Sequence, residues 1–107
     1  MKGEGVELND ELAVKWFEKA ANHGAVVAQY HLGYCYYHGR GVELNYEKAV
    51  YWFAQAIKRN HAAAEYYMGL CLYYGNGVPK DLAKAQVCFR KAVKQGYEEA
   101  GNLLKAL

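Results

Sequence analysis

The sequence predicts an all-α fold, a right-handed α-solenoid built from antiparallel helical hairpins with six helices in all. Two observations predict it. The segment from Leu32 to Asn45 returns 36 residues later, from Met68 to Asp81, and within each copy apolar residues recur at helical spacing. A period of this length is typical of solenoids, in which no unit buries its apolar face alone. No stretch of the sequence has the alternating pattern of a strand.

The repeat divides the 107 residues, which form one domain, into four parts. We expect a partial repeat over residues 1–24, complete repeats over 25–60 and 61–96, and a C-terminal capping helix over 97–107. The short motif from Gly5 to Asn9 matches the loop from Gly41 to Asn45, so it is interpreted as the loop of an earlier copy whose first half is missing.

The helices are expected at about 10–23, 26–38, 46–59, 62–74, 82–95 and 98–106. Each complete repeat has a first and a second helix, and each helix has one apolar stripe that should face the core. The stripes of the first helices are Ala28, Leu32 and Tyr36, then Ala64, Met68 and Leu72. The stripes of the second helices are Ala13, Trp16, Phe17 and Ala20, then Ala49, Trp52, Phe53 and Ala56, then Ala85, Cys88, Phe89 and Ala92.

The residues between the stripes are of the kinds that end and begin helices. Gly39 and Gly75 stand where each first helix should end in a left-handed residue. The second helices should begin at side chains that cap them, and should end at residues that tolerate a positive φ. The caps are Asn9, Asn45 and Asp81, and the ends are Gly24, Asn60 and Gly96.

The two ends of the chain differ in polarity. Lys105 occupies the position of Gly33 and Gly69, so the last helix is expected to cap the array. The helix with Trp16 and Phe17 has no first helix before it, so part of its apolar surface should lie open. We expect either a longer array or a homodimer through this open N-terminal helix face.

The repeated residues resemble a known family. The pattern Ala-x3-Leu-Gly-x2-Tyr-x2-Gly-x-Gly-Val-x2-Asn/Asp-x2-Lys-Ala-x2-Trp-Phe-x2-Ala is similar to the Sel-one-like repeat (SLR), a relative of the tetratricopeptide repeat, and covers nearly the whole chain. Leu72, Cys88 and Lys105 depart from the pattern. The resemblance implies an adaptor or scaffold protein, as in many bacterial members, and no known reaction. It also implies that the first helices line the inner curve of the superhelix.

The composition argues against several classes of function. The chain has neither serine nor threonine, which excludes serine and threonine nucleophiles and N-glycosylation sites. The net charge of +2 is spread along the chain, so no nucleic-acid partner is expected. No segment resembles a signal peptide or reaches the roughly 20 apolar residues of a membrane span, so we expect no membrane partner. Together with three cysteines interpreted as free thiols, this favours a cytoplasmic location. No cofactor is expected.

The candidate site is the face of the first helices that points away from the core. At 100° per residue, Tyr30, Tyr34 and Tyr37 project away from Leu32. Because the resemblance places this face on the inner curve, we expect a tyrosine-lined groove that binds a peptide or helix of a partner protein. The candidate partner-binding residues are Tyr30, His31, Tyr34, Tyr37, His38, Tyr66, Tyr67, Leu70, Tyr73 and Tyr74.

Five alternatives stand beside this interpretation. In the first, the tyrosines only pack against neighbouring first helices and close the solenoid. In the second, the chain is a self-assembling structural solenoid unit. An RNA-binding repeat is disfavoured by the weak charge. An enzyme with Cys35 as nucleophile is disfavoured because Cys35 projects toward the core, so we expect no enzyme. His31, Cys35 and His38 have the spacing of zinc ligands, but Cys35 recurs at Cys71 while the histidines do not recur, so no metal site is expected.

Overall fold

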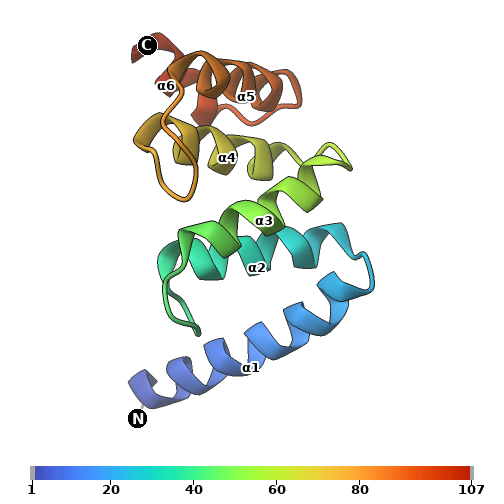
Figure 1. Ribbon diagram of the computed structural model, residues 1–107. Helices are drawn as coiled ribbons and strands as arrows, with labels where there is room; N and C mark the ends of the chain where they lie inside the picture. The colour runs from blue at the N-terminus through green and yellow to red at the C-terminus, as the bar shows by residue number, and fades with distance from the viewer. Residues whose placement is uncertain (1, 107) are drawn as a thin grey trace.

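The computed structural model describes residues 2–106 as six helices stacked in one column, with the two ends of the chain at opposite ends of the column (Figure 1). The described residues contain no strand, which confirms the predicted all-α class and the number of helices. The column measures 42 × 27 × 24 Å. The helices are α1 (Lys2–Asn22), α2 (Val26–His38), α3 (Tyr46–Ile57), α4 (Ala62–Tyr74), α5 (Leu82–Lys94) and α6 (Glu99–Ala106).

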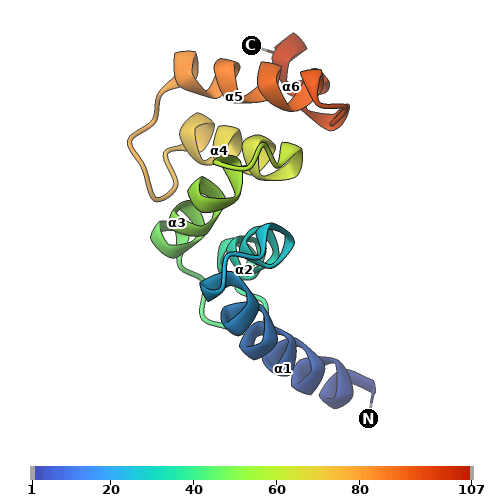
Figure 2. The ribbon, with the colours of Figure 1, turned by 90° about the vertical axis from the view of Figure 1, so that its right-hand side faces the viewer.

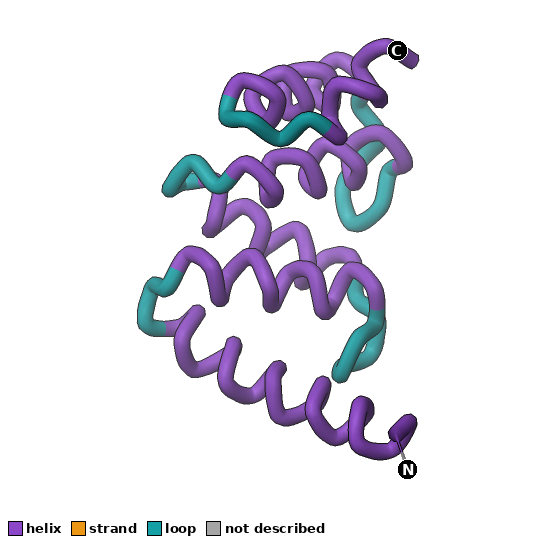
Figure 3. Tube along the Cα trace, turned by 180° about the vertical axis from the view of Figure 1, so that it is seen from behind, coloured by secondary structure: helices purple, strands orange, loops and turns teal. Residues whose placement is uncertain are grey.

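Each helix packs against the next one along the chain, and the same stacking order is seen from the side in Figure 2. The most extensive contacts join α2 to α3 and α4 to α5, which are the helix pairs of the two complete repeats. The short turns after α1, α3 and α5 lie on one side of the column, and the longer loops after α2 and α4 lie on the other (Figure 3). The right-handed twist stays a prediction.

Most helix ends follow the predicted punctuation. Asn45 Oδ1 accepts a hydrogen bond from Lys48 N, and Asp81 Oδ1 accepts one from Lys84 N, both at 3.0 Å. These bonds satisfy backbone donors that a helix start leaves free. The predicted left-handed residues all have positive φ, and they are Gly24, Gly39, Asn60, Gly75 and Gly96.

Helix α1 starts earlier than the sequence predicts. Residues 5–9, expected to form a loop ending in the cap Asn9, lie inside α1, so both expectations were wrong. In the complete repeats, the last residue of the loop forms a hydrogen bond with the helix that precedes the loop. Asn45 N donates to Tyr36 O and Asp81 N donates to Leu72 O, both at 2.9 Å. No helix precedes residues 5–9 in the described part of the chain, so their backbone groups pair within α1 instead.

The core consists of three clusters of buried residues that follow one another along the column. Small residues dominate them, so the helices approach closely. Gly33 makes room for a ring, because a Cβ there would lie 2.7 Å from Cδ1 of Phe53, and Gly69 has the same relation to Phe89. The clusters are Val14, Ala21, Ala28, Leu32 and Cys35, then Ala49, Phe53, Ala56, Ala64 and Cys71, then Ala85, Phe89, Ala92 and Ala100.

Trp16 is not a core residue, contrary to the sequence prediction. It is 68% exposed, and Val14 is buried in its place at 3% exposure. One repeat later, Trp52 packs against the cluster that contains Val14. No described helix takes the corresponding position beside Trp16, so its ring stays open, with Lys19 Nζ 5.6 Å from the ring centroid. An open apolar surface on this helix is therefore present, as expected, and includes Leu12 at 53% exposure.

Candidate partner-binding face

The ten predicted residues lie on α2 and α4, and most of their side chains are half-buried between helices. Tyr67 is the clearest example. Its ring stacks on Phe53 of α3, with centroids 5.4 Å apart and an interplanar angle of 18°. On the α2 side, the Tyr67 ring meets Tyr34 at 5.7 Å and Tyr37 at 5.2 Å. Tyr67 thus links two first helices, as the packing interpretation expects.

His31 occupies in α2 the position that Tyr67 occupies in α4. Its ring stacks on Phe17 of α1 at 5.1 Å and 17°, which repeats the contact between Tyr67 and Phe53. The sequence pattern treated this histidine as outside the repeat, because the residue type changes. The stacked aromatic contact nevertheless recurs, so His31 has a packing role.

Tyr30 and Tyr66 form a second recurring set of contacts. Tyr30 lies 4.6 Å from His61 between ring centroids, and one repeat later Tyr66 lies 5.0 Å from Tyr97. Both tyrosines also contact a core phenylalanine at about the same distance, Tyr30 at 6.2 Å from Phe53 and Tyr66 at 6.0 Å from Phe89. These tyrosines therefore support the column as well as lining its face.

The remaining predicted residues differ in exposure. Leu70 and Tyr73 pack against the cluster that contains Phe89, and Tyr37 packs against the cluster that contains Phe53. Among the tyrosines of the two first helices, the sequence clearly assigned only Tyr36 to the core. That assignment was too narrow, because each first helix also contacts the following repeat. Tyr74 is exposed at 59%.

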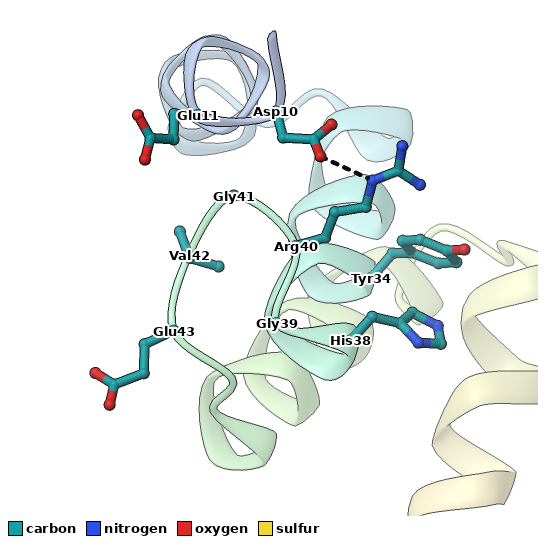
Figure 4. A pocket seen from close by; sticks show the side chains of 9 residues that line it. All are labelled: Asp10, Glu11, Tyr34, His38, Gly39, Arg40, Gly41, Val42 and Glu43. Atoms are coloured by element: carbon teal, nitrogen blue, oxygen red, sulfur yellow. Dashed lines mark hydrogen bonds and ion pairs between the residues drawn. The ribbon is translucent and has the colours of Figure 1, made fainter. Parts of the chain in front are cut away.

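Two adjoining cavities lie between α1, α2 and the loop after α2. The aromatic cavity has a volume of about 310 Å³ and is lined by Asp10, Ala13, Phe17, Tyr30, His31, Tyr34, Cys35 and Arg40. The loop cavity has about 800 Å³ and is lined by Asp10, Glu11, Tyr34, His38, Gly39, Arg40, Gly41, Val42 and Glu43 (Figure 4). Four predicted residues, Tyr30, His31, Tyr34 and His38, line one or both of them.

Arg40 and Asp10 line both cavities, and neither was predicted. Arg40 Nε donates to Asp10 Oδ2 at 3.2 Å, which joins the loop to α1 (Figure 4). Gly41 brings the loop this close, because a Cβ there would lie 2.6 Å from the backbone oxygen of Asp10. The counterpart of Arg40 in the next repeat is Asn76, so the repeat pattern gave no reason to select it.

Burial shifts the pKa values of Tyr30, Cys35 and His38 toward the uncharged form of each group. Burial raises the pKa of Tyr30 to about 12, so its hydroxyl stays protonated. Burial, followed by the charge of Arg40, lowers the pKa of His38, which favours the uncharged ring. Burial, followed by the charge of Asp10, raises the pKa of Cys35. A protonated thiol is a poor nucleophile, so this face offers hydrogen-bond donors and apolar area rather than a reactive thiolate.

Neither a metal centre nor a membrane span emerges from residues 2–106. No three His, Cys, Asp or Glu side chains in this range converge as metal ligands would. No helix in the same range combines the length and the apolar character that a membrane span requires.

The repeated motif matches a protein family over most of the sequence. The Sel1 repeat model matches residues 1–24, 26–61 and 62–97. The chain belongs to the Sel1 repeat family. This is the Sel-one-like family that the motif resembles, and its members are generally protein-interaction scaffolds and typically non-catalytic. No curated protein matches the sequence significantly.

Solved structures of bacterial Sel1 repeat proteins are similar to this chain. A Sel1 repeat protein from Oxalobacter formigenes is 36% identical, with a TM-score of 0.81 over 88% of this chain. The protective antigen c5321 of uropathogenic Escherichia coli, which has an SLR fold, is 30% identical, with a TM-score of 0.86 over 90% of this chain. This chain spans 39% of the first of these proteins and 21% of the second.

A third similar structure is cysteine-rich protein B of Helicobacter pylori. It is 27% identical, with a TM-score of 0.76 over 85% of this chain, and this chain spans 68% of it. In this chain all three cysteines are free, with Cys35 and Cys71 buried in the core. The Sel1 repeat fold is therefore held here by packing of small and aromatic residues.

Proposed function

We propose that this chain is a non-catalytic scaffold that binds a peptide or helix of a partner protein on the face of α2, at the aromatic cavity. The observation that carries the proposal is the position of Tyr30, His31 and Tyr34, which line a cavity of about 310 Å³ beside Phe17. Ligand pockets have volumes of about 300–1,000 Å³ and aromatic walls, so this cavity suits one large side chain of a partner.

The proposal gives the aromatic residues of α2 and α4 two roles. Tyr67 and Tyr66 hold neighbouring helices together through their contacts with Phe53 and Phe89. Tyr34 is better suited to a partner, because it lines both cavities. Tyrosine offers a large contact area at a small entropic cost, as is common at binding hot spots. We therefore centre the groove on Tyr34, with the other predicted residues extending it.

The test compares Tyr34→Ala with Tyr51→Ala in pull-downs from a cell lysate, read by mass spectrometry. Tyr51 is the matched control, because it is 55% exposed and lines neither of the two cavities. We expect Tyr34→Ala to lose a partner that both the wild type and Tyr51→Ala retain. If all three proteins retain the same partners, binding at the aromatic cavity is contradicted. Thermal melts of both variants establish that they fold.

Self-association through α1 is a second candidate, favoured by the exposure of Trp16 at 68% and Leu12 at 53%. Leu12 and Trp16 stand about one turn apart on α1, and large apolar side chains exposed next to each other are typical of an interaction site. Light scattering of the purified wild type and of Trp16→Lys would distinguish a monomer from a dimer. A dimer that becomes a monomer in the variant would support this candidate, and a monomeric wild type at high concentration would contradict it.

A further inference from the structure

We infer that the partner segment carries an acidic side chain that binds Arg40, next to an aromatic residue that enters the aromatic cavity. This inference rests on the proposed function and adds the chemistry of the bound segment. Three features of Arg40 lead to it: the hydrogen bond that it makes, its exposure, and its position in the lining of both cavities.

The bond to Asp10 uses one nitrogen of the Arg40 guanidinium, Nε, at 3.2 Å. In Figure 4 the two terminal nitrogens of Arg40 point away from Asp10 and away from the loop. A guanidinium binds a carboxylate best through two parallel N–H donors, and such charge-assisted pairs are stronger than neutral hydrogen bonds. Arg40 is therefore held in place by Asp10 while its terminal donors face solvent.

The accessible charge of this ion pair is the positive one. The side chain of Arg40 is 54% exposed, whereas that of Asp10 is 24% exposed. Figure 4 shows Tyr34 and His38 on the same side of the loop as the Arg40 side chain, while Glu11 and Glu43 project on the opposite side. A ligand on the Arg40 side thus meets a cation, a phenol and an imidazole, beside the less exposed Asp10 carboxylate that Arg40 already binds. This charge pattern complements a carboxylate.

The aromatic cavity fixes what lies beside that carboxylate. Arg40 and Tyr34 line both cavities, so a group bound to Arg40 adjoins the rings of Phe17, Tyr30 and His31. Aromatic rings favour other aromatic rings in tilted or offset arrangements. In an extended peptide, side chains two positions apart point to the same side, separated by about 6.6 Å. We therefore assign the site to a segment in which an aromatic residue and an acidic residue stand two positions apart.

The experiment measures retention of synthetic peptide pools on the immobilised full chain. Each pool has a fixed tryptophan, then one randomised residue, then glutamate, glutamine or lysine, with amidated C-termini. We expect the glutamate pool to be retained about twofold to fivefold better than the glutamine pool, the range of exposed ion pairs. The lysine pool should be retained least. The preference for the glutamate pool over the glutamine pool should fall at high salt, because exposed charges are screened.

Two variants separate charge recognition from folding. Arg40→Gln should abolish the preference for glutamate, and Arg40→Lys should keep part of it, because lysine retains the charge but loses the paired donors. Tyr51→Ala should behave as the wild type. Equal retention of the three pools, better retention of the lysine pool, or an unchanged preference in Arg40→Gln would overturn the inference. If the inference fails while Tyr34→Ala still loses its partner in the lysate experiment, the proposed function stands.

A third set of pools tests the source of the carboxylate. It carries tryptophan and glutamine in the same positions but ends in a free C-terminal carboxylate directly after the glutamine. Retention of this set above the amidated glutamate pool would assign Arg40 to a chain terminus and overturn the side-chain inference. Weaker retention of this set would support it.

Discussion

Gly33 shows how a single residue sets the spacing of two helices. A Cβ at Gly33 would lie 2.7 Å from Cδ1 of Phe53, a fully buried ring that cannot shift freely. We expect Gly33→Ala to reduce the free energy of unfolding by about 1–3 kcal/mol, the cost of overpacking. Denaturant unfolding followed by circular dichroism measures it.

The matched control for this prediction is Gly101→Ala. Gly101 is also helical, but a Cβ there would make ordinary contact with Val93 Cγ2 at 3.7 Å. Alanine is the better helix former, so this variant should be unchanged or more stable by up to about 1 kcal/mol. A loss of stability in Gly101→Ala equal to that in Gly33→Ala would show that contact with Phe53 is not the cause.

His61 makes the stability of α4 depend on pH. Its Nδ1 accepts a hydrogen bond from Ala64 N at 3.2 Å, which only an unprotonated Nδ1 can do. Burial, followed by the charge of His31, lowers the pKa of His61 from 6.5. Because the folded pKa lies below the unfolded one, this stabilisation is complete above about pH 6.5 and is lost as the pH falls below it.

We expect His61→Asn to weaken this dependence, since asparagine caps a helix without titrating. Melting temperatures of both proteins between about pH 7.5 and pH 5.5 test it, and the wild type should lose more stability than the variant. The buried carboxyl of Glu65 has a raised pKa, chiefly from burial, and acts in the opposite direction. Its effect is common to both proteins and cancels in the comparison. Parallel pH profiles would refute the role of His61.

At the scale of whole elements, the sequence predicted helices well where a loop and its cap act locally. Asn45 and Asp81 cap α3 and α5 as expected, because a cap needs only its own side chain and the next turn. The same motif failed at Asn9, where the loop also needs a preceding helix to receive its backbone donors. Trp16 was misplaced for a similar reason, because its burial depends on a neighbouring repeat. Arg40 was missed because it lies outside the repeat pattern.

The loops after α2 and α4 join consecutive repeats through their second glycines. Gly77 has φ +76°, and a Cβ there would lie 2.7 Å from the backbone oxygen of Tyr46. Gly24 has φ +92°, and a Cβ there would have no neighbouring atom within 4 Å. We expect Gly24→Ala to cost about 1–2 kcal/mol from backbone strain alone. Gly77→Ala should cost at least about 1 kcal/mol more, since the loop must move off α3. Equal losses in the two unfolding curves would rule out this contact as an anchor.

In the whole molecule, each helix is held by its neighbours along the column rather than by one central core. The three buried clusters follow one another, and Tyr36 packs against both the first and the second of them. In such an array, stability is close to a sum of repeat and interface contributions. The partner-binding face proposed at α2 therefore depends on the packing of α3 and α4 behind it.

This organisation predicts that protection against hydrogen exchange is graded along the column. Helices α3 and α4 pack between neighbours on both sides, whereas α6 packs on α5 and has one fully buried residue, Ala100. We expect amides of α6 to exchange first and those of α3 and α4 last, because local opening is cheapest where few contacts are lost. Ala56→Leu, at a position with no exposed surface, should overpack the middle of the column and cost about 1–3 kcal/mol. The Ala56→Leu variant should lose most protection in α3 and α4, so the exchange rates of these two helices should approach those of α6. Equal exchange rates in all helices of the wild type would instead mean that the column opens as one unit, and nearest-neighbour stacking would then be insufficient to describe its stability.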